Sequence, residues 1–303
     1  MEKIIFYFPL LLILFVFLIL MAGLQFHRKL ARLKKRRSPL AHNLLRSPGE
    51  SLIRRLDNLN VEINTYIFSL IITPILIYSF PISLSYYRVM NPSLFDIFVP
   101  VILGILFTIY LLGKLVKLLK ERKITRLGYE GEVAVGQQLN QLMLKGYRVY
   151  HDFPAGNFNI DHILVGQSGV FAIETKARSK PTSRNFVENA TVSYDGRLLH
   201  FPQGPDVKTI AQAKHRALWL TKWLFRAIGE QVMVRPVVAL PGWYVKRTSA
   251  DGIPVVNPKQ FPSLFEHIAP RFLSPEVISR ITGQLEQKCR DAIPQFDRTT
   301  PSK

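Results

Sequence analysis

The chain has 303 residues, enough for two or three structural units, and its formal net charge at pH 7 is +19. A charge of this size calls for an acidic partner, and nucleic acid and anionic lipid are the two candidates. The single cysteine, Cys289, excludes an intramolecular disulfide framework and is typical of a reducing compartment. We interpret it as an inert thiol on a late helix.

An uncharged apolar segment covers residues 4–24. Its length matches the roughly 20 residues that a helix needs to cross the hydrocarbon core. A secretory signal peptide is the alternative, but it should end in small residues at a cleavage site. This segment runs from Met21-Ala22-Gly23 almost directly into His27-Arg28-Lys29. We therefore favour a retained membrane anchor.

Two further apolar runs follow, at about 66–87 and 97–112. The first contains Pro74 and Pro81, which membrane helices tolerate where neighbouring groups satisfy the freed carbonyls. A buried helical hairpin or a re-entrant pair is the alternative. We predict two further transmembrane helices, so that 1–126 form a membrane region.

The distribution of Lys and Arg predicts the orientation. The segment 25–65 is rich in both, whereas the loop between the second and third runs contains only Arg88. The positive-inside rule then places 25–65 in the cytoplasm as a basic loop. It places everything after Lys114 there too, behind a second basic flank. The expected location is the inner (plasma) membrane, with several spans and a cytoplasmic carboxy-terminal domain.

Within the basic loop, residues 34–37 read Lys-Lys-Arg-Arg. We interpret this cluster as a topology signal and a contact with lipid headgroups, with a nucleic-acid patch as the alternative. The amphipathic pattern at 44–59 predicts a surface helix.

The composition changes near Leu127, where long apolar runs give way to alternating helix and strand patterns. Apolar spacing over 130–145 predicts a helix that ends at Gly146, and 147–153 form the first expected strand. Two β-branched, apolar runs then surround the turn Gly166-Gln167-Ser168-Gly169, which predicts a hairpin.

If Val165 faces Val170 in this hairpin, Asp161 lies opposite Glu174, and strand alternation puts Lys176 on the same face. His162 turns to the other face. Two facing carboxylates repel, and a divalent cation such as Mg²⁺ would remove the conflict. The alternative is a surface ion pair between Glu174 and Lys176, and the hairpin alone does not decide between them.

Three motifs in order carry a family resemblance: Gly128-Tyr129-Glu130-Gly131-Glu132, Asn159-Ile160-Asp161-His162 and Gly169-Val170-Phe171-Ala172-Ile173-Glu174-Thr175-Lys176. Over about 127–240 the chain resembles the nuclease-related domain, NERD, a branch of the PD-(D/E)XK nuclease superfamily. The resemblance implies an α/β fold, a restriction-endonuclease-like domain with a central mixed β-sheet flanked by helices. We expect this domain at 127–245 and a helical extension at 246–303 that packs on it.

The resemblance also implies site residues. Asp161 and Glu174 match the metal-binding carboxylates, Glu132 the leading acidic residue, and Lys176 the lysine of the superfamily. Gln212 resembles a glutamine that often follows the core, although a surface glutamine is the alternative. Glu132 could instead be a first-turn residue that complements a helix dipole.

The rest of the domain is expected to contain a hairpin at 190–200 around Asp195-Gly196, a helix at 207–226, a strand at 231–240 and helices at 260–268 and 275–292. Pro236 predicts an edge position for the strand. Trp219 and Trp223 share a helix face, and we favour core packing over stacking on bases. The helix also carries basic residues that could follow a phosphate backbone or form a solvated face: Lys208, Lys214, His215, Arg216 and Lys222. Residues 299–303 should form a frayed tail.

The resulting hypothesis is a membrane-anchored nuclease that depends on Mg²⁺ or Mn²⁺ and hydrolyses phosphodiester bonds, with DNA favoured over RNA. Its partners would be nucleic acid and membrane lipid, and the sequence leaves the oligomeric state open. The alternative is a non-catalytic module that tethers DNA to the membrane. A transport or signalling protein fits less well, because the apolar runs carry almost no interior charges of the kind that mark substrate pathways.

Overall fold

The computed structural model describes residues 43–87, 94–181, 190–267 and 272–292, together with isolated positions between 19 and 26. Nearly all of the first expected span, the basic cluster 34–37 and the tail 299–303 lie outside the described residues. Two compact units are present. One contains His42–Glu62 and Leu118–Ile293, and the other contains Ile63–Lys117.

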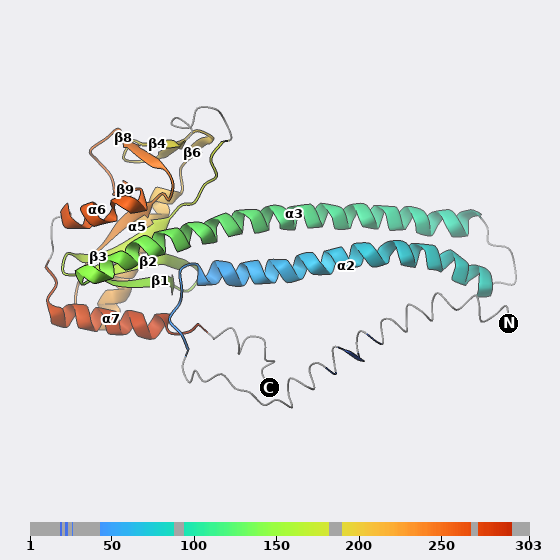
Figure 1. The fold of residues 1–303 in the computed structure, drawn as a ribbon, viewed down its shortest axis with the longest axis horizontal. Helices are drawn as coiled ribbons and strands as arrows, with labels where there is room; N and C mark the ends of the chain where they lie inside the picture. The colour runs from blue at the N-terminus through green and yellow to red at the C-terminus, as the bar shows by residue number, and fades with distance from the viewer. Residues whose placement is uncertain are drawn as a thin grey trace. The chain divides into compact units, whose positions relative to one another are not determined.

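Two long helices contain the second and third apolar runs: α2 spans Glu50–Tyr87 and α3 spans Leu94–Gln141 (Figure 1). The prediction of separate, shorter helices was wrong. α2 continues from the amphipathic segment through Pro74 and Pro81, and α3 joins the third run to the helix expected at 130–145. The surface helix predicted at 44–59 begins only at Glu50, and residues 44–49 are not helical.

In the unit Ile63–Lys117, α2 and α3 pack closely at Gly104. A Cβ atom there would lie 2.1 Å from Cδ1 of Ile77. Outward-facing side chains of both helices are apolar and exposed, among them Phe68, Ile71 and Leu106. Both helices are long and apolar enough to cross a membrane, with mean hydropathies of 1.6 and 2.2 over their most apolar windows. Only 11% of either window is buried, unlike the core helix of a soluble protein.

A five-stranded mixed sheet forms the centre of the other unit, in the order β1-β2-β3-β7-β9. Its strands are β1 (Arg148–Pro154), β2 (Asn159–Gly166), β3 (Gly169–Thr175), β7 (Val234–Ala239) and β9 (Val255–Val256). The first three are antiparallel, and β7 and β9 run parallel to β3. The expected α/β architecture with a mixed sheet and flanking helices is confirmed.

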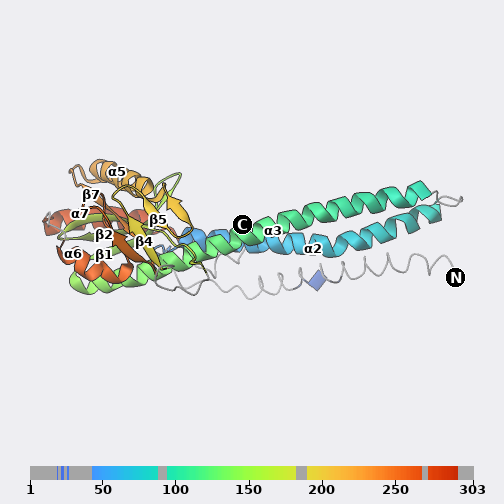
Figure 2. The same ribbon diagram turned by 90° about the horizontal axis from the view of Figure 1, so that it is seen from above.

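Helices cover both faces of this sheet (Figure 2). On one face, α5 (Thr209–Ile228) and α7 (Pro275–Cys289) pack on alternate strand residues such as Ile163 and Ala172. On the other face, the end of α3, the short helix η1 (Leu142–Lys145) and α6 (Phe261–His267) pack on residues such as Leu164 and Phe171. The period-2 alternation of β2 and β3 thus supplies two cores.

α5 ends where Gly229 adopts a φ of 74° and donates its N–H to Phe225. Its Trp219 and Trp223 rings contact Phe153 of β1, with ring centroids 6.3 Å and 5.1 Å away. The prediction that both tryptophans pack in the core is confirmed. The thiol of Cys289 is also buried, and burial raises its pKa to about 12, which fits an inert thiol.

A smaller sheet has the order β6-β5-β4-β8. Its strands are β4 (Thr191–Tyr194), β5 (Leu199–Phe201), β6 (Gly204–Asp206) and β8 (Tyr244–Arg247). The hairpin expected around Asp195-Gly196 is confirmed as β4–β5, and Asp195 accepts hydrogen bonds from the N–H groups of Arg197 and Leu198 in its turn.

The edge position predicted for the Pro236 strand was wrong, because β7 lies between β3 and β9. Pro236 pairs with Ala172 of β3. On the other side, β9 has only two residues and pairs only with Val238 and Ala239. The stretch around Pro236 therefore keeps one open side, where a missing N–H does no harm.

The segment before α2 is bound into the sheet unit. Leu44 and Ala292 exchange two backbone hydrogen bonds, of 2.7 and 3.0 Å. Arg46 donates to both carboxylate oxygens of Asp291 and to Oδ2 of Asp152. Ser51 at the start of α2 donates to Asp152 through its N–H and its hydroxyl. Residues 43–51 are therefore part of the folded unit.

Candidate functional site

The register of the β2–β3 hairpin decides where its acidic residues lie. The paired residues include the expected pair of Val165 with Val170. The last pair is His162 with Ile173, so Asp161 on β2 and Glu174 on β3 each lie one position beyond the paired residues. Both carboxylates are buried, at 8% and 7% exposure. The N–H of Thr175 donates to Oδ2 of Asp161 over 2.7 Å. The open end of the hairpin thus holds two buried acidic side chains.

One arginine joins these two carboxylates. Nη1 of Arg216, on α5, donates to Oδ1 of Asp161 over 2.8 Å and also to Oε2 of Glu174. The Arg216 side chain keeps 19% of its surface exposed. A single positive charge therefore serves two buried carboxylates, and it remains within reach of solvent.

Burial raises the pKa of both carboxyl groups. For Asp161 the cause is desolvation, which the charge of Arg216 and the N–H of Thr175 oppose. For Glu174 it is desolvation together with repulsion from Asp161, again opposed by Arg216 and more weakly by Lys176. The pair is short of positive charge.

A third carboxyl group, Glu132 on α3, adds to this shortage. α3 approaches the end of β3 closely at Gly131, where a Cβ atom would lie 2.5 Å from that of Ala177. Glu132 is buried next to this contact, and desolvation followed by repulsion from Asp161 raises its pKa to about 9. Its Oε2 atom is buried without a hydrogen-bond partner. An unsatisfied buried oxygen of this kind calls for a cation or a donor.

Lys176 directly follows β3, and its N–H donates to the carbonyl of Ala239 over 2.9 Å. Its ammonium group lies 3.3 Å from Oδ2 of Asp206. Asp206 also accepts from the N–H groups of Lys208 and Thr209 at the start of α5. Asp206 at the end of β6 therefore supplies a carboxylate to Lys176, and α5 supplies a guanidinium to Asp161 and Glu174.

Gln212 lies one helical turn before Arg216 on α5 and is exposed. Among the residues that the structure describes, no hydrogen bond joins its side chain to Asp161, Glu174 or Glu132. The fold thus brings Glu132, Asp161, Glu174 and Lys176 to one end of the sheet, with Gln212 on the adjoining surface.

Residues 127–241 match the family model of the nuclease-related domain. This part of the chain is a nuclease-related domain. Curated proteins and solved structures give no match. The match contains the motif residues Glu132, Asp161, Glu174 and Lys176, and it also contains Arg216.

The donor set of the nuclease-related domain suits a hard divalent cation. Asp161, Glu174 and Glu132 offer only carboxylate oxygens, the ligands that Mg²⁺ and Mn²⁺ prefer. The unpartnered Oε2 of Glu132 points to a missing positive charge. In the described ranges, no three acidic, His or Cys side chains are arranged to hold a metal ion as they stand. Arg216 lies between two of the candidates.

Arg216 is the residue that sequence reasoning missed, since it was grouped with the solvated basic face of its helix. Its position carried a usable signal. It lies three residues after Ala213 and four before Leu220, both of which face the core. An arginine on the core-facing stripe of a helix requires a buried acidic partner. The other basic residues that were grouped with Arg216 are exposed: Lys208, Lys214, His215 and Lys222.

His162 faces away from the carboxylates, as alternation predicts, and meets His151 of β1 with 2.8 Å between their Nδ1 atoms. Nε2 of His151 lies 3.3 Å from Oδ1 of Asn140 and must donate to it. For a neutral pair, His162 then donates from Nδ1 and its Nε2 is an unpartnered acceptor. Desolvation lowers the pKa of both rings, for His151 to about 4, so both are neutral at pH 7.

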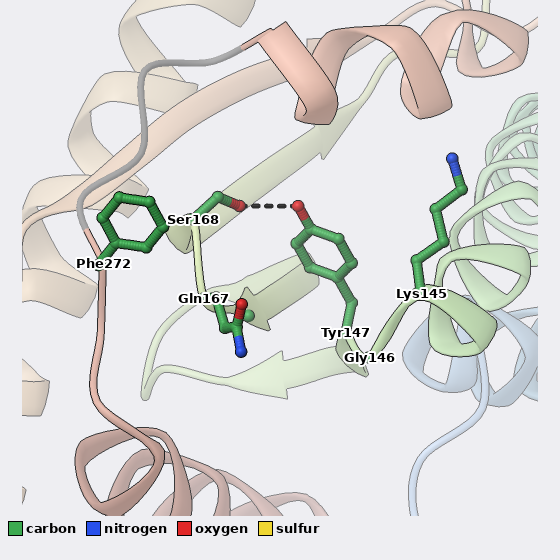
Figure 3. Close-up of a pocket in the computed structure, with 7 residues that line it drawn as sticks. Lys145, Gly146, Tyr147, Gln167, Ser168 and Phe272 are labelled. Atoms are coloured by element: carbon green, nitrogen blue, oxygen red, sulfur yellow. Dashed lines mark hydrogen bonds between the residues drawn. The ribbon is translucent and has the colours of Figure 1, made fainter.

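A pocket of about 280 Å³ lies at the opposite end of the hairpin (Figure 3). It is lined by Tyr147, the turn residues Gln167 and Ser168, and Phe272, and the Tyr147 and Ser168 hydroxyls are 2.7 Å apart. Glu174 lies six positions after Ser168 along an extended strand, or about 20 Å away. This pocket is distinct from the carboxylate cluster.

Proposed function

We propose that the chain is a membrane-anchored, metal-dependent nuclease that hydrolyses phosphodiester bonds of nucleic acid, with DNA as the favoured polymer. The observation that supports this most is the convergence of buried Asp161 and Glu174 with Lys176 inside a nuclease-related domain. We also propose that its mixed sheet is of the restriction-endonuclease-like type.

Asp161, Glu174 and Glu132 are the residues that would hold Mg²⁺ or Mn²⁺. Such a cation supplies a Lewis acid and a water of lowered pKa. The carboxylates position it by their fixed places on β2, β3 and α3. Glu132 would hold the cation as a carboxylate, because the positive charge would offset the desolvation and the repulsion from Asp161 that raise its pKa.

Lys176 would stabilise the charge that develops on the scissile phosphate. Its side chain is 36% exposed, and Asp206 holds its ammonium group beside the cluster. A substrate phosphate can therefore also bind the ammonium group of Lys176. Gln212, exposed on α5, would bind nucleic acid next to the reacting phosphate.

The two long helices would anchor this domain. Their exposed apolar side chains suit lipid, and α3 carries a basic flank behind its apolar run, with Lys114, Lys117 and Lys120. By the positive-inside rule, this flank and the nuclease-related domain lie in the cytoplasm of a multi-pass protein of the inner (plasma) membrane.

The competing function is a non-catalytic module that tethers DNA to the membrane. Arg216 already neutralises part of the carboxylate pair, and the exposed basic residues of α5 suit a phosphate backbone. The two functions differ at Lys176. A nuclease loses turnover when this residue is replaced, whereas a tether keeps most of its affinity.

The test is cleavage of plasmid DNA, single-stranded DNA and RNA by the full chain in lipid nanodiscs, with Mg²⁺, Mn²⁺ or EDTA. The full chain is needed because a fragment that starts at 127 cuts α3 and loses 42–62 of the folded unit. Asp161→Ala and Lys176→Ala are the test variants. Asp251→Ala and Lys259→Ala, at exposed positions, are matched controls.

Metal-dependent cleavage that both test variants lose and both controls keep would support the nuclease and identify its polymer. A folded protein that binds DNA but cleaves nothing with any metal would support the tether.

A further inference from the structure

The guanidinium of Arg216 lies where the proposed function requires a cation, between Asp161 and Glu174. One charge against two buried carboxylates leaves this end of the sheet under-neutralised, with Glu132 nearby and one of its oxygens unpartnered. Arg216 reaches this place from α5, where it lies one turn after the exposed Gln212 and directly before the buried Ala217. Its contact is therefore at the rim of the core.

We propose that Arg216 is a phosphate-binding residue of the nuclease site, which pairs with Asp161 and Glu174 until a divalent cation binds them and then turns to a phosphate of the nucleic acid. This inference rests on the proposed function, because it assumes that the carboxylates bind a cation. It adds a further substrate-binding residue and an order of events.

Electrostatics makes the two cations exclude each other. A divalent ion bound to Asp161 and Glu174 neutralises both carboxylates and repels a guanidinium a few Å away. The long, unbranched stem of arginine lets its head group move while the helix backbone stays in place. The core-facing stripe of α5, which includes Ala217, holds that backbone against the sheet.

The displaced guanidinium needs a new acidic partner. Asp206 is already occupied by Lys176 and by two N–H groups of α5. A phosphate of the bound strand is the remaining anion, and the planar fork of arginine suits phosphate oxygens. Arg216 and Lys176 would then bind the same stretch of the nucleic-acid backbone. Cation binding thus creates a phosphate site that the carboxylates otherwise hold closed.

Arg216→Gln and Arg216→Lys in the full chain in nanodiscs test this proposal. The matched control is Arg226→Gln, an exposed arginine of the same helix. Mg²⁺ and Mn²⁺ affinity is measured by calorimetry without nucleic acid. Loss of the competing guanidinium in Arg216→Gln should tighten cation binding about 10-fold, an ordinary coupling between two ligands of one site.

DNA affinity is measured by fluorescence anisotropy as a function of salt, in Mg²⁺ and in EDTA. The Lys176→Ala background keeps the strand intact. In Mg²⁺, Arg216→Gln should weaken binding and reduce the slope of log Kd against log salt by about one phosphate contact. In EDTA, Arg216→Gln should change neither the DNA affinity nor the salt slope, because Asp161 and Glu174 hold Arg216 when no cation is bound. A purely structural role would not produce this metal dependence.

If the parent protein binds no divalent cation, the proposed function itself fails. If it binds the cation, but Arg216→Gln leaves both the cation affinity and the salt slope unchanged, only the role of Arg216 fails. Circular dichroism checks the fold. Should Arg216→Gln unfold, Arg216→Lys decides: it keeps the charge and loses the fork, so DNA binding should weaken several-fold in Mg²⁺ and stay constant in EDTA. If Arg216→Lys binds DNA as tightly as the parent protein in Mg²⁺ as well as in EDTA, the proposal is overturned.

Discussion

Two buried aspartates of the sheet unit are each held by an arginine, yet their surroundings differ. Asp152 accepts hydrogen bonds from Arg46, from Asn159 and twice from Ser51. Its backbone φ is 47°, an unusual value for a residue other than glycine. Asp161 shares Arg216 with a second carboxylate.

The difference separates a structural contact from an exchangeable one. The donors to Asp152 come from Arg46, Ser51 and Asn159, and Arg46 also donates to Asp291. At Asp161 the positive charge is too small for the acidic groups around it, and its source remains partly exposed. A satisfied buried network stabilises one structure, whereas an under-neutralised one binds ligands.

The largest expected effect is on the Asp152 cluster. Arg46→Ala removes the charge that faces Asp152, whose side chain is only 2% exposed. Breaking a buried ion pair in this way typically costs about 3–5 kcal/mol of unfolding free energy. Thermal and denaturant unfolding of the full chain measure the loss. Arg290→Ala, which breaks an exposed pair with Glu286, should cost about 0–1 kcal/mol. Equal losses in the two variants would contradict the structural role of Arg46.

The second prediction concerns the Asp161 cluster. Lys176→Ala should reduce the cleavage rate by about 10²–10³-fold, the usual effect of removing a group that stabilises developing charge. Its unfolding temperature should change little, because its partner Asp206 keeps two N–H donors. Single-turnover kinetics measure the cleavage rate, and calorimetry measures the unfolding temperature. A large loss of stability with proportionate loss of activity would make Lys176 structural.

The third prediction uses the histidine pair that lies between the clusters, with His151 next to Asp152 and His162 next to Asp161 in sequence. Burial lowers the pKa of His151 to about 4, so the unfolded chain takes up its proton first as the pH falls. The contribution of His151 to stability should therefore be fully present above about pH 6.5 and be lost, by about 2–3 kcal/mol, as the pH approaches 4. The difference in unfolding free energy between the parent and His151→Gln should change by this amount over the same pH range. An unchanged difference would mean that His151 does not contribute.

The smallest expected effect tests whether the hydrogen-bond donors to Asp152 contribute to stability independently of one another. Ser51→Ala removes the 2.7 Å hydrogen bond from the Ser51 hydroxyl and leaves the one from its N–H. The loss should be about 1 kcal/mol. Ser279→Ala, at an exposed position of α7, is the matched control and should be neutral. A loss as large as that of Arg46→Ala would show that the network fails as a whole.

Local pattern predicted much of this fold. Strand alternation and a Gly-containing turn were enough for the β2–β3 hairpin and its register, because a shift of one residue would have exposed every core side chain of β2. Helix boundaries near the apolar runs were not predictable in the same way. α3 continues from the third apolar run to Gln141, because no residue in this stretch ends the helix.

The sequence by itself determined which acidic residues could meet, since Asp161 and Glu174 follow from a single hairpin. It also determined the apolar character of the long helices. Only the tertiary structure decided which charge lies between those carboxylates, because Arg216 reaches them from a helix 42 residues beyond Glu174. It also tied 43–51 to Asp152 and Asp291. Contacts between distant segments depend on how helices pack on the sheet, and local periodicity does not encode that packing.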